Sequence, residues 1–97
     1  MTFETIPAKN VGNYMGKEKV LMKDLRDVES FKKNRIYNAI NIPYSRIEKG
    51  DFSLPKEYLL VLYCERGGKS FSAARILSSM GFSVIAVAGG MEMYFES

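Results

Sequence analysis

The sequence predicts a three-layer α/β domain, with a mostly parallel sheet of about five strands and helices on both faces. Two continuous apolar runs of strand length, 58–63 and 82–88, support this prediction, because such runs are typical of strands buried on both sides. The segment between them has helical spacing, and strand, helix and strand in that order imply a right-handed crossover between parallel strands. The length of 97 residues is enough for one domain, 1–97, with a real core.

Shorter elements are predicted before this unit. Residues 2–6 alternate weakly and run into Pro7, which favours an edge strand followed by a helix to about Met15. Residues 19–25 form a compact apolar run with charged residues at its end, as expected of a buried strand. Asp27 then serves as the N-cap of a short amphipathic helix.

The middle of the chain gives weaker signals. Residues 38–43 are expected to form a short strand or an extended segment, because Pro43 disfavours helix at the residue before it. Residues 44–54 are expected to form a loop with room for one helical turn, and 91–97 a short closing segment.

A helix is predicted to begin at Ser70. Ala73, Leu77 and Met80 are spaced by four and three residues, and Gly81 suits the left-handed position at a helix C-terminus. Three phenylalanines are expected in the core: Phe31, Phe71 and Phe82.

Composition excludes several classes of function. Fourteen Lys and Arg against 11 Asp and Glu give a net charge of +3, which is too mild to indicate a nucleic-acid surface. The absence of histidine excludes Ser-His and Cys-His catalysis and any His-ligated metal, and the sequence indicates no cofactor or metal site. One cysteine allows no disulfide within the chain, and no signal peptide or membrane span is evident, so we expect a soluble cytoplasmic protein.

The residues with the clearest chemical potential follow the apolar run at 58–63. Cys64 stands where this predicted strand ends, and ligands bind at that edge of open α/β sheets. A helix N-terminus stabilises a thiolate, and Arg66 and Lys69 add positive charge. Gly67 and Gly68 allow the loop to curl with its N–H groups turned inward, which predicts a cradle for anionic sulfur or an oxyanion.

Two better-known anion loops fit less well. A nucleotide-binding phosphate loop that ends in Gly68-Lys69-Ser70 needs a glycine at position 63, which is tyrosine here. A cysteine phosphatase or arsenate reductase loop carries Arg six positions after its cysteine, where this chain has Ser70. Nucleotide binding is therefore rejected, and phosphatase or arsenate reductase chemistry is the weaker hypothesis.

The sequence resembles the single-domain rhodanese, or thiosulfate sulfurtransferase, family over nearly its whole length. The loop Cys64-Glu65-Arg66-Gly67-Gly68-Lys69-Ser70 resembles the family's C-R-x-G-x-R-S pattern. The other matching segments are Asp24-Leu25-Arg26, Glu29 with Phe31, Ile36 with 38–43, and 81–91 from Gly81-Phe82 to Gly89-Gly90-Met91. The chain departs from the family pattern at Arg35 for His, Asn38 for Gly, Tyr94 for Trp and Glu65 for Arg.

The resemblance implies that Cys64 is a nucleophile that takes the outer sulfur of thiosulfate or another donor, while Glu65 to Ser70 hold the resulting persulfide. A thiol or cyanide is the implied acceptor, and a protein is a possible donor or acceptor. Asp24 and Arg26, near the same sheet edge, are expected to form an ion pair or to bind loop backbone. Glu65 is expected to oppose an incoming anion by like charge, with the neighbouring Arg66 as an offset.

Two further hypotheses stay open for the same loop. One is a sulfur-carrier or interaction module that receives persulfide from a protein partner and turns over little thiosulfate. The other is redox sensing by Cys64, which the chain supports poorly because it has no second cysteine.

Overall fold

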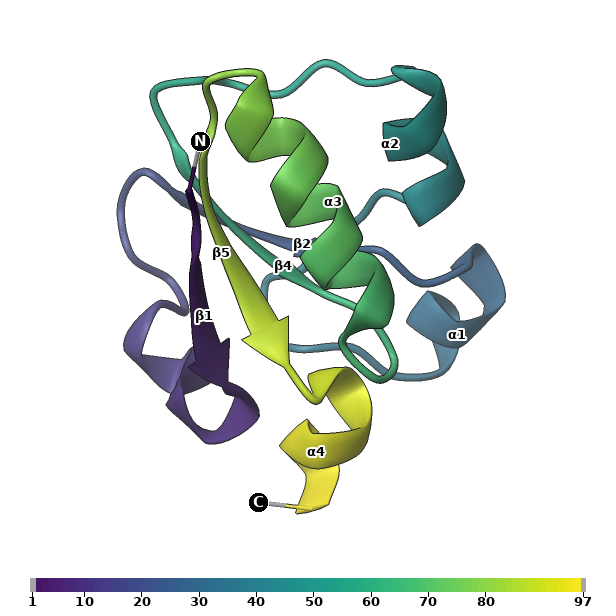
Figure 1. Cartoon of the computed structure of the whole chain (residues 1–97). Coiled ribbons are helices and arrows are strands. Elements are labelled where there is room, and N and C mark those ends of the chain that lie inside the picture. The colour runs from purple at the N-terminus through teal and green to yellow at the C-terminus, as the bar shows by residue number, and fades with distance from the viewer. Residues whose placement is uncertain (1, 97) are drawn as a thin grey trace.

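A computed structural model describes residues 2–96 and contains a five-stranded, fully parallel sheet in the order β1-β5-β4-β2-β3 (Figure 1). The strands are β1 (Glu4–Pro7), β2 (Val20–Asp24), β3 (Ile40–Asn41), β4 (Leu59–Tyr63) and β5 (Ser83–Ala88). The helices are η1 (Ala8–Asn13, a 3₁₀ helix), α1 (Val28–Lys33), α2 (Tyr44–Lys49), α3 (Gly68–Ser79) and α4 (Gly90–Glu96). The predicted fold class is confirmed.

The sheet separates two hydrophobic clusters, which give the three layers. On one face, Leu60 and Leu62 of β4 share a cluster with Ile47 of α2 and Leu77 of α3. On the other face, the cluster includes Val11 of η1, Val61 and Tyr63 of β4, and Met91 of α4. Helices therefore cover both faces, as the continuous apolar strands predicted.

The register of the central strands determines where the site lies. β4 runs between β2 and β5, and its last residue, Tyr63, pairs with Asp24 at the end of β2. The residues that follow, Cys64 after β4 and Arg26 after β2, consequently emerge at the same edge of the sheet. Asp27 begins α1 there and accepts a hydrogen bond from the Ser30 N–H at 2.8 Å, as its N-cap role predicted.

Two helices differ from the sequence prediction. The helix after Pro7 is a six-residue 3₁₀ helix that ends at Asn13, short of Met15, in a segment containing Gly12, which disfavours helix. The predicted loop after Pro43 contains the six-residue helix α2, because Ile47 buries its side chain against the α3 layer. Tertiary burial outweighs the weak local signal in α2.

Helix α3 begins at Gly68, two residues earlier than predicted, and Gly81 follows it in the left-handed conformation, with a φ of +94°. The prediction that Phe71 is buried is wrong. Its side chain is 44% exposed on the outer face of α3, where its ring packs edge-on against Phe3, with centroids 5.1 Å apart. Phe82 is buried as predicted, whereas Phe31 is only half-buried.

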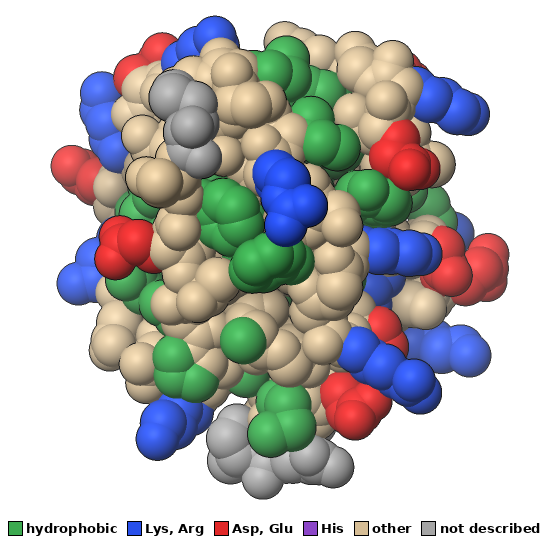
Figure 2. All heavy atoms as spheres, viewed as in Figure 1, with side chains coloured by type: hydrophobic (Ala, Val, Ile, Leu, Met, Phe, Trp, Pro, Cys, Tyr) green, Lys and Arg blue, Asp and Glu red, His purple; other side chains and the backbone are tan. Residues whose placement is uncertain are grey.

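The surface reflects this packing. Apolar side chains gather over the middle of the face that α3 covers, and charged side chains lie mostly around its periphery (Figure 2). Within residues 2–96, no helix is long and apolar enough to span a membrane.

Candidate functional site

Cys64 directly follows β4, and its sulfur lies inside the turn that connects β4 to α3. The thiol is buried, and its Sγ atom accepts hydrogen bonds from the Gly67 N–H at 3.0 Å and the Ser70 N–H at 3.4 Å. These donors come from the last residue before α3 and from the helix's first turn. We call residues 64–70 the cysteine loop. A sulfur in this position meets backbone dipoles aligned to stabilise negative charge.

The side chain of Ser70 lies inside the cysteine loop. It is fully buried, and its hydroxyl donates to the Gly67 carbonyl at 2.9 Å and lies 3.7 Å from the cysteine sulfur. Gly67 adopts a φ of +106°, and a Cβ atom there would lie 3.0 Å from the backbone nitrogen of Gly89. Both residues therefore set the curl of the loop, and only glycine suits the Gly67 position.

The first two carbonyl groups of the loop, those of Cys64 and Glu65, face the opposite way, toward α4. The Met91 N–H donates to the Cys64 carbonyl at 2.8 Å, and the Glu92 N–H donates to the Glu65 carbonyl at 3.0 Å. A Cβ at Gly90 would come within 2.8 Å of both the carbonyl carbon and the carbonyl oxygen of Glu65, so backbone touches backbone there. The start of the loop is thus supported from outside, while the Gly67 and Ser70 amides point inward to sulfur.

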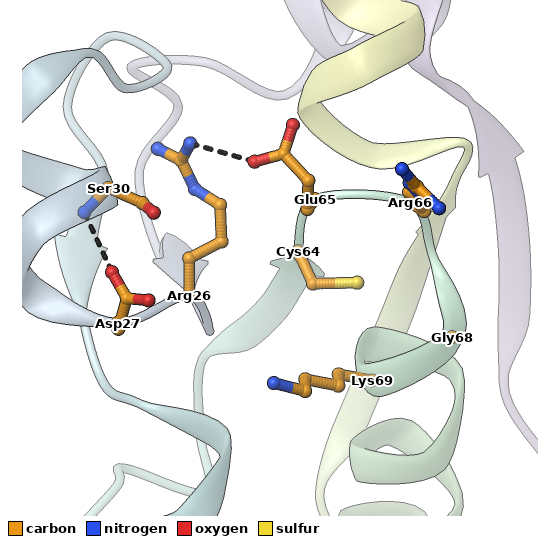
Figure 3. Close-up of a pocket in the computed structure, with 8 residues that line it drawn as sticks. All are labelled: Arg26, Asp27, Ser30, Cys64, Glu65, Arg66, Gly68 and Lys69. Atoms are coloured by element: carbon orange, nitrogen blue, oxygen red, sulfur yellow. Dashed lines mark hydrogen bonds and ion pairs between the residues drawn. The ribbon is translucent and has the colours of Figure 1, made fainter.

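A pocket of about 490 Å³ opens beside the sulfur (Figure 3). Its lining residues are Arg26, Asp27, Ser30, Cys64, Glu65, Arg66, Gly68 and Lys69. Cys64 lies between Glu65 and Lys69, and Arg26 and Asp27, from the segment between β2 and α1, lie across the pocket from it (Figure 3). This space is large enough for a small anion or an extended thiol group beside the cysteine.

Asp24 and Arg26 form an ion pair, one of the two arrangements expected from the sequence, and the pair is buried. The guanidinium donates to both carboxylate oxygens, at 2.8 Å from Nη2 and 3.1 Å from Nε, and the two side chains are 0% and 6% exposed. Burial opposes the charge of Arg26, but its hydrogen bonds and its Coulomb attraction to Asp24 outweigh burial and raise its pKa. The same guanidinium reaches Glu65 at 3.3 Å from Nη1, a link from β2 to the cysteine loop.

The two cations of the loop differ in their partners. Arg66 is 83% exposed and pairs with Glu92 of α4 at 3.1 Å, so its charge is shared with a carboxylate outside the pocket. Lys69 forms no ion pair within 4 Å among the described residues. The pKa of Asp27 is lowered chiefly by the hydrogen bond from the Ser30 N–H, and the charge of Lys69 lowers it further. Lys69 is therefore the pocket cation with the least compensated charge.

Sequence reasoning missed part of this arrangement. Asp27 and Ser30 line the pocket, although the sequence pattern indicated Asp27 only as a helix cap and did not single out Ser30. The available signal was that β2 ends at the same sheet edge as β4. The contact between Gly90 and the loop backbone was also missed, although two consecutive glycines directly after a buried strand indicate a close backbone approach.

The fold and the loop define a class of α/β protein in which one cysteine, between a central strand and a helix, lies under converging backbone amides. A sequence model described as the rhodanese-like domain matches residues 7–97. The chain belongs to the rhodanese-like domain family.

Named relatives agree with this assignment. The chain is 26% identical over 95 residues to "Thiosulfate sulfurtransferase GlpE" of Coxiella burnetii, covering 97% of this chain and 89% of that protein. It is 32% identical over 75 residues to "Putative sulfur carrier protein YrkF" of Bacillus subtilis, covering 76% and 40%. The crystal structure of a rhodanese-like domain protein from Staphylococcus aureus superimposes with a TM-score of 0.82 at 25% identity, covering 95% and 91%. Family membership and these relatives support a sulfurtransferase-like class for the chain.

Proposed function

We propose that this protein transfers sulfane sulfur through a persulfide on Cys64. The observation that carries the proposal is the position of the sulfur, which accepts two backbone N–H groups and borders a pocket of about 490 Å³. Inward amides stabilise both the thiolate and the persulfide anion without a side-chain base. The absence of histidine from the sequence is therefore no obstacle to this chemistry.

The reaction has two steps. The Cys64 thiolate attacks the outer sulfur of thiosulfate, the sulfur–sulfur bond breaks, and sulfite leaves with its electron pair. The amides of Glu65 to Ser70 hold the Cys64 persulfide, with Lys69 supplying positive potential. Cyanide or a thiol then attacks the outer sulfur of the persulfide and regenerates the Cys64 thiolate. No cofactor takes part in either step.

Turnover tests this proposal. Thiocyanate release from thiosulfate and cyanide should saturate with thiosulfate for the wild type and vanish for Cys64→Ser. The serine variant retains the size of the side chain, so circular dichroism and thermal unfolding should match the wild type closely. Equal thiocyanate release by both proteins would refute the proposed role of Cys64.

A second candidate function is that of a sulfur carrier that receives persulfide from a protein and turns over little thiosulfate. The similarity to a relative named as a sulfur carrier favours it, as does a carboxylate at Glu65 on the pocket. A persulfide-bearing donor protein that loads Cys64 while thiosulfate fails to saturate would favour the carrier. Phosphatase or arsenate reductase chemistry has less support, because Ser70 is buried inside the loop where those enzymes need arginine.

A further inference from the structure

We propose that Glu65, held in place by Arg26, selects against doubly charged sulfur donors, so that the preferred donor is a singly charged or neutral sulfane-sulfur compound. This inference rests on the proposed function, since it names the substrate class of the same site. It concerns the choice of donor and leaves the persulfide step itself unchanged.

The first argument is the charge balance around Arg26. Two carboxylates, those of Asp24 and Glu65, share one guanidinium, and Asp24 takes the shorter contacts from it. Asp24 is fully buried, while Glu65 is 56% exposed and lines the pocket. Arg26 therefore fixes the position of Glu65, but its positive charge is already matched by the buried partner. The cluster of Asp24, Arg26 and Glu65 has one more carboxylate than cations, and Glu65 is the carboxylate of this cluster that lines the pocket.

The second argument concerns the remaining cations. Arg66 is paired with Glu92, and Lys69 faces a pocket that also contains the Asp27 carboxylate. No lining cation is both free of a carboxylate and buried against the sulfur. From this surface a dianion such as thiosulfate meets the loop amides and the exposed Lys69, and it is repelled by Glu65 twice as strongly as a monoanion.

The test compares two donors that share one chemistry and differ in charge. Thiosulfate carries two negative charges, and methanethiosulfonate carries one. In each case the Cys64 thiolate attacks the terminal sulfur and the sulfur–sulfur bond breaks. The leaving group, sulfite or methanesulfinate, takes the electron pair. The measured quantity is the ratio of kcat/KM for thiosulfate to that for methanethiosulfonate, with cyanide as the acceptor.

Glu65→Gln keeps the shape of the side chain and removes its charge. We expect this variant to raise the ratio roughly three- to fivefold at low ionic strength, the order expected for one extra unit charge nearby in a water-like dielectric. The increase should come mainly from a lower KM for thiosulfate. It should shrink in salt on the order of 1 M, where screening acts within about 3 Å.

The matched control is Glu57→Gln. Glu57 is exposed just before β4, at the opposite end of that strand from Cys64, so the variant makes the same change in net charge away from the pocket. Its donor ratio should equal that of the wild type.

A ratio unchanged by Glu65→Gln, or changed equally by Glu57→Gln, would overturn the inference. A wild type that forms no Cys64 persulfide from either donor would instead refute the proposed function. The two failures are therefore distinguishable.

Discussion

Two regions surround the Cys64 sulfur, and they are built differently. The backbone of the cysteine loop, residues 64–70, forms a ring around it. The charged side chains of Arg26, Asp27 and Glu65 form a wall across the pocket. In the ring, the Gly67 and Ser70 amides point at sulfur, and the Cys64 and Glu65 carbonyls accept hydrogen bonds from α4. In the wall, Arg26 and Glu65 meet in an ion pair, and Asp27 lies nearby. The polarity of the ring is fixed because it comes from backbone groups. The charge of the wall can change by substitution because it comes from side chains.

This difference separates two properties of the site. Holding sulfur depends on backbone groups, which any sequence that allows the loop's conformation supplies. Choosing the donor depends on Glu65, Lys69 and their partners, which substitution alters without changing the fold. The predictions below test each region, from the largest expected effect to the smallest.

Removing the cation of the wall should have the largest effect on stability. Arg26→Met leaves the fully buried Asp24 carboxylate without its partner, and breaking a buried pair costs about 3–5 kcal/mol of unfolding free energy. Urea denaturation measures this loss. Arg66→Met removes an exposed ion pair and should cost less than about 1 kcal/mol. Equal losses in the two variants would mean that Arg26 does not neutralise Asp24.

The outer support of the ring should be nearly as sensitive. In Gly90→Ala the new methyl group would come within 2.8 Å of the Glu65 backbone, at a residue with a φ of +55°. We expect a loss of about 2–4 kcal/mol in the free energy of unfolding and a fall in sulfur transfer.

Gly68→Ala is the matched control for this variant, because nothing lies within 4 Å of the new atom and the residue is helical. Its stability should equal or slightly exceed that of the wild type. If Gly90→Ala is as stable and active as Gly68→Ala, α4 does not support the loop.

Inside the ring, Ser70→Ala removes the hydroxyl that donates to the Gly67 carbonyl at 2.9 Å. We expect a loss of about 1 kcal/mol, because the part-buried Gly67 carbonyl loses this hydrogen bond and keeps the one from the Phe71 N–H. Sulfur transfer should fall but persist, since the Ser70 N–H remains. Complete loss of persulfide formation in a folded variant would show that the hydroxyl, and not the backbone, holds the sulfur.

The smallest effect concerns the edge of the wall. Asp27 is an exposed N-cap whose pKa is lowered, chiefly by the Ser30 N–H. A carboxyl whose pKa is lower in the folded state stabilises the protein at pH values above its unfolded-state pKa of 3.8. This contribution is lost as the pH falls through the lower pKa of the folded state. The stability difference between the wild type and Asp27→Ala should therefore shrink between pH 5 and pH 2. A constant difference would contradict this account.

The sequence was sufficient for the parts of this comparison that depend on local pattern. The apolar run of β4 and the glycines after Cys64 predicted a cysteine loop between a buried strand and a helix. Asp27 was recognised as a cap because capping chemistry is local. Asn38 departs from the family's glycine, yet it adopts a φ of +68°, which asparagine tolerates better than most residues.

The parts that depend on tertiary contact were not predictable. The direction of Arg66 depends on Glu92, 26 residues later, and the position of Glu65 depends on Arg26, 39 residues earlier. Phe71 has an apolar aromatic side chain, as core residues often do, but it lies on the outward side of α3. Helix α2 is stabilised because Ile47 packs in the core, and the burial of this side chain cannot be read from the neighbouring sequence alone.

The most direct measurement for the central claim is the intact mass of the protein after incubation with thiosulfate or methanethiosulfonate. The account predicts that the wild type gains the mass of one sulfur atom, that Cys64→Ser gains none, and that cyanide removes the added sulfur as thiocyanate. If neither of these donors nor a persulfide-bearing protein adds sulfur to the wild type, the claim that Cys64 carries sulfane sulfur is contradicted.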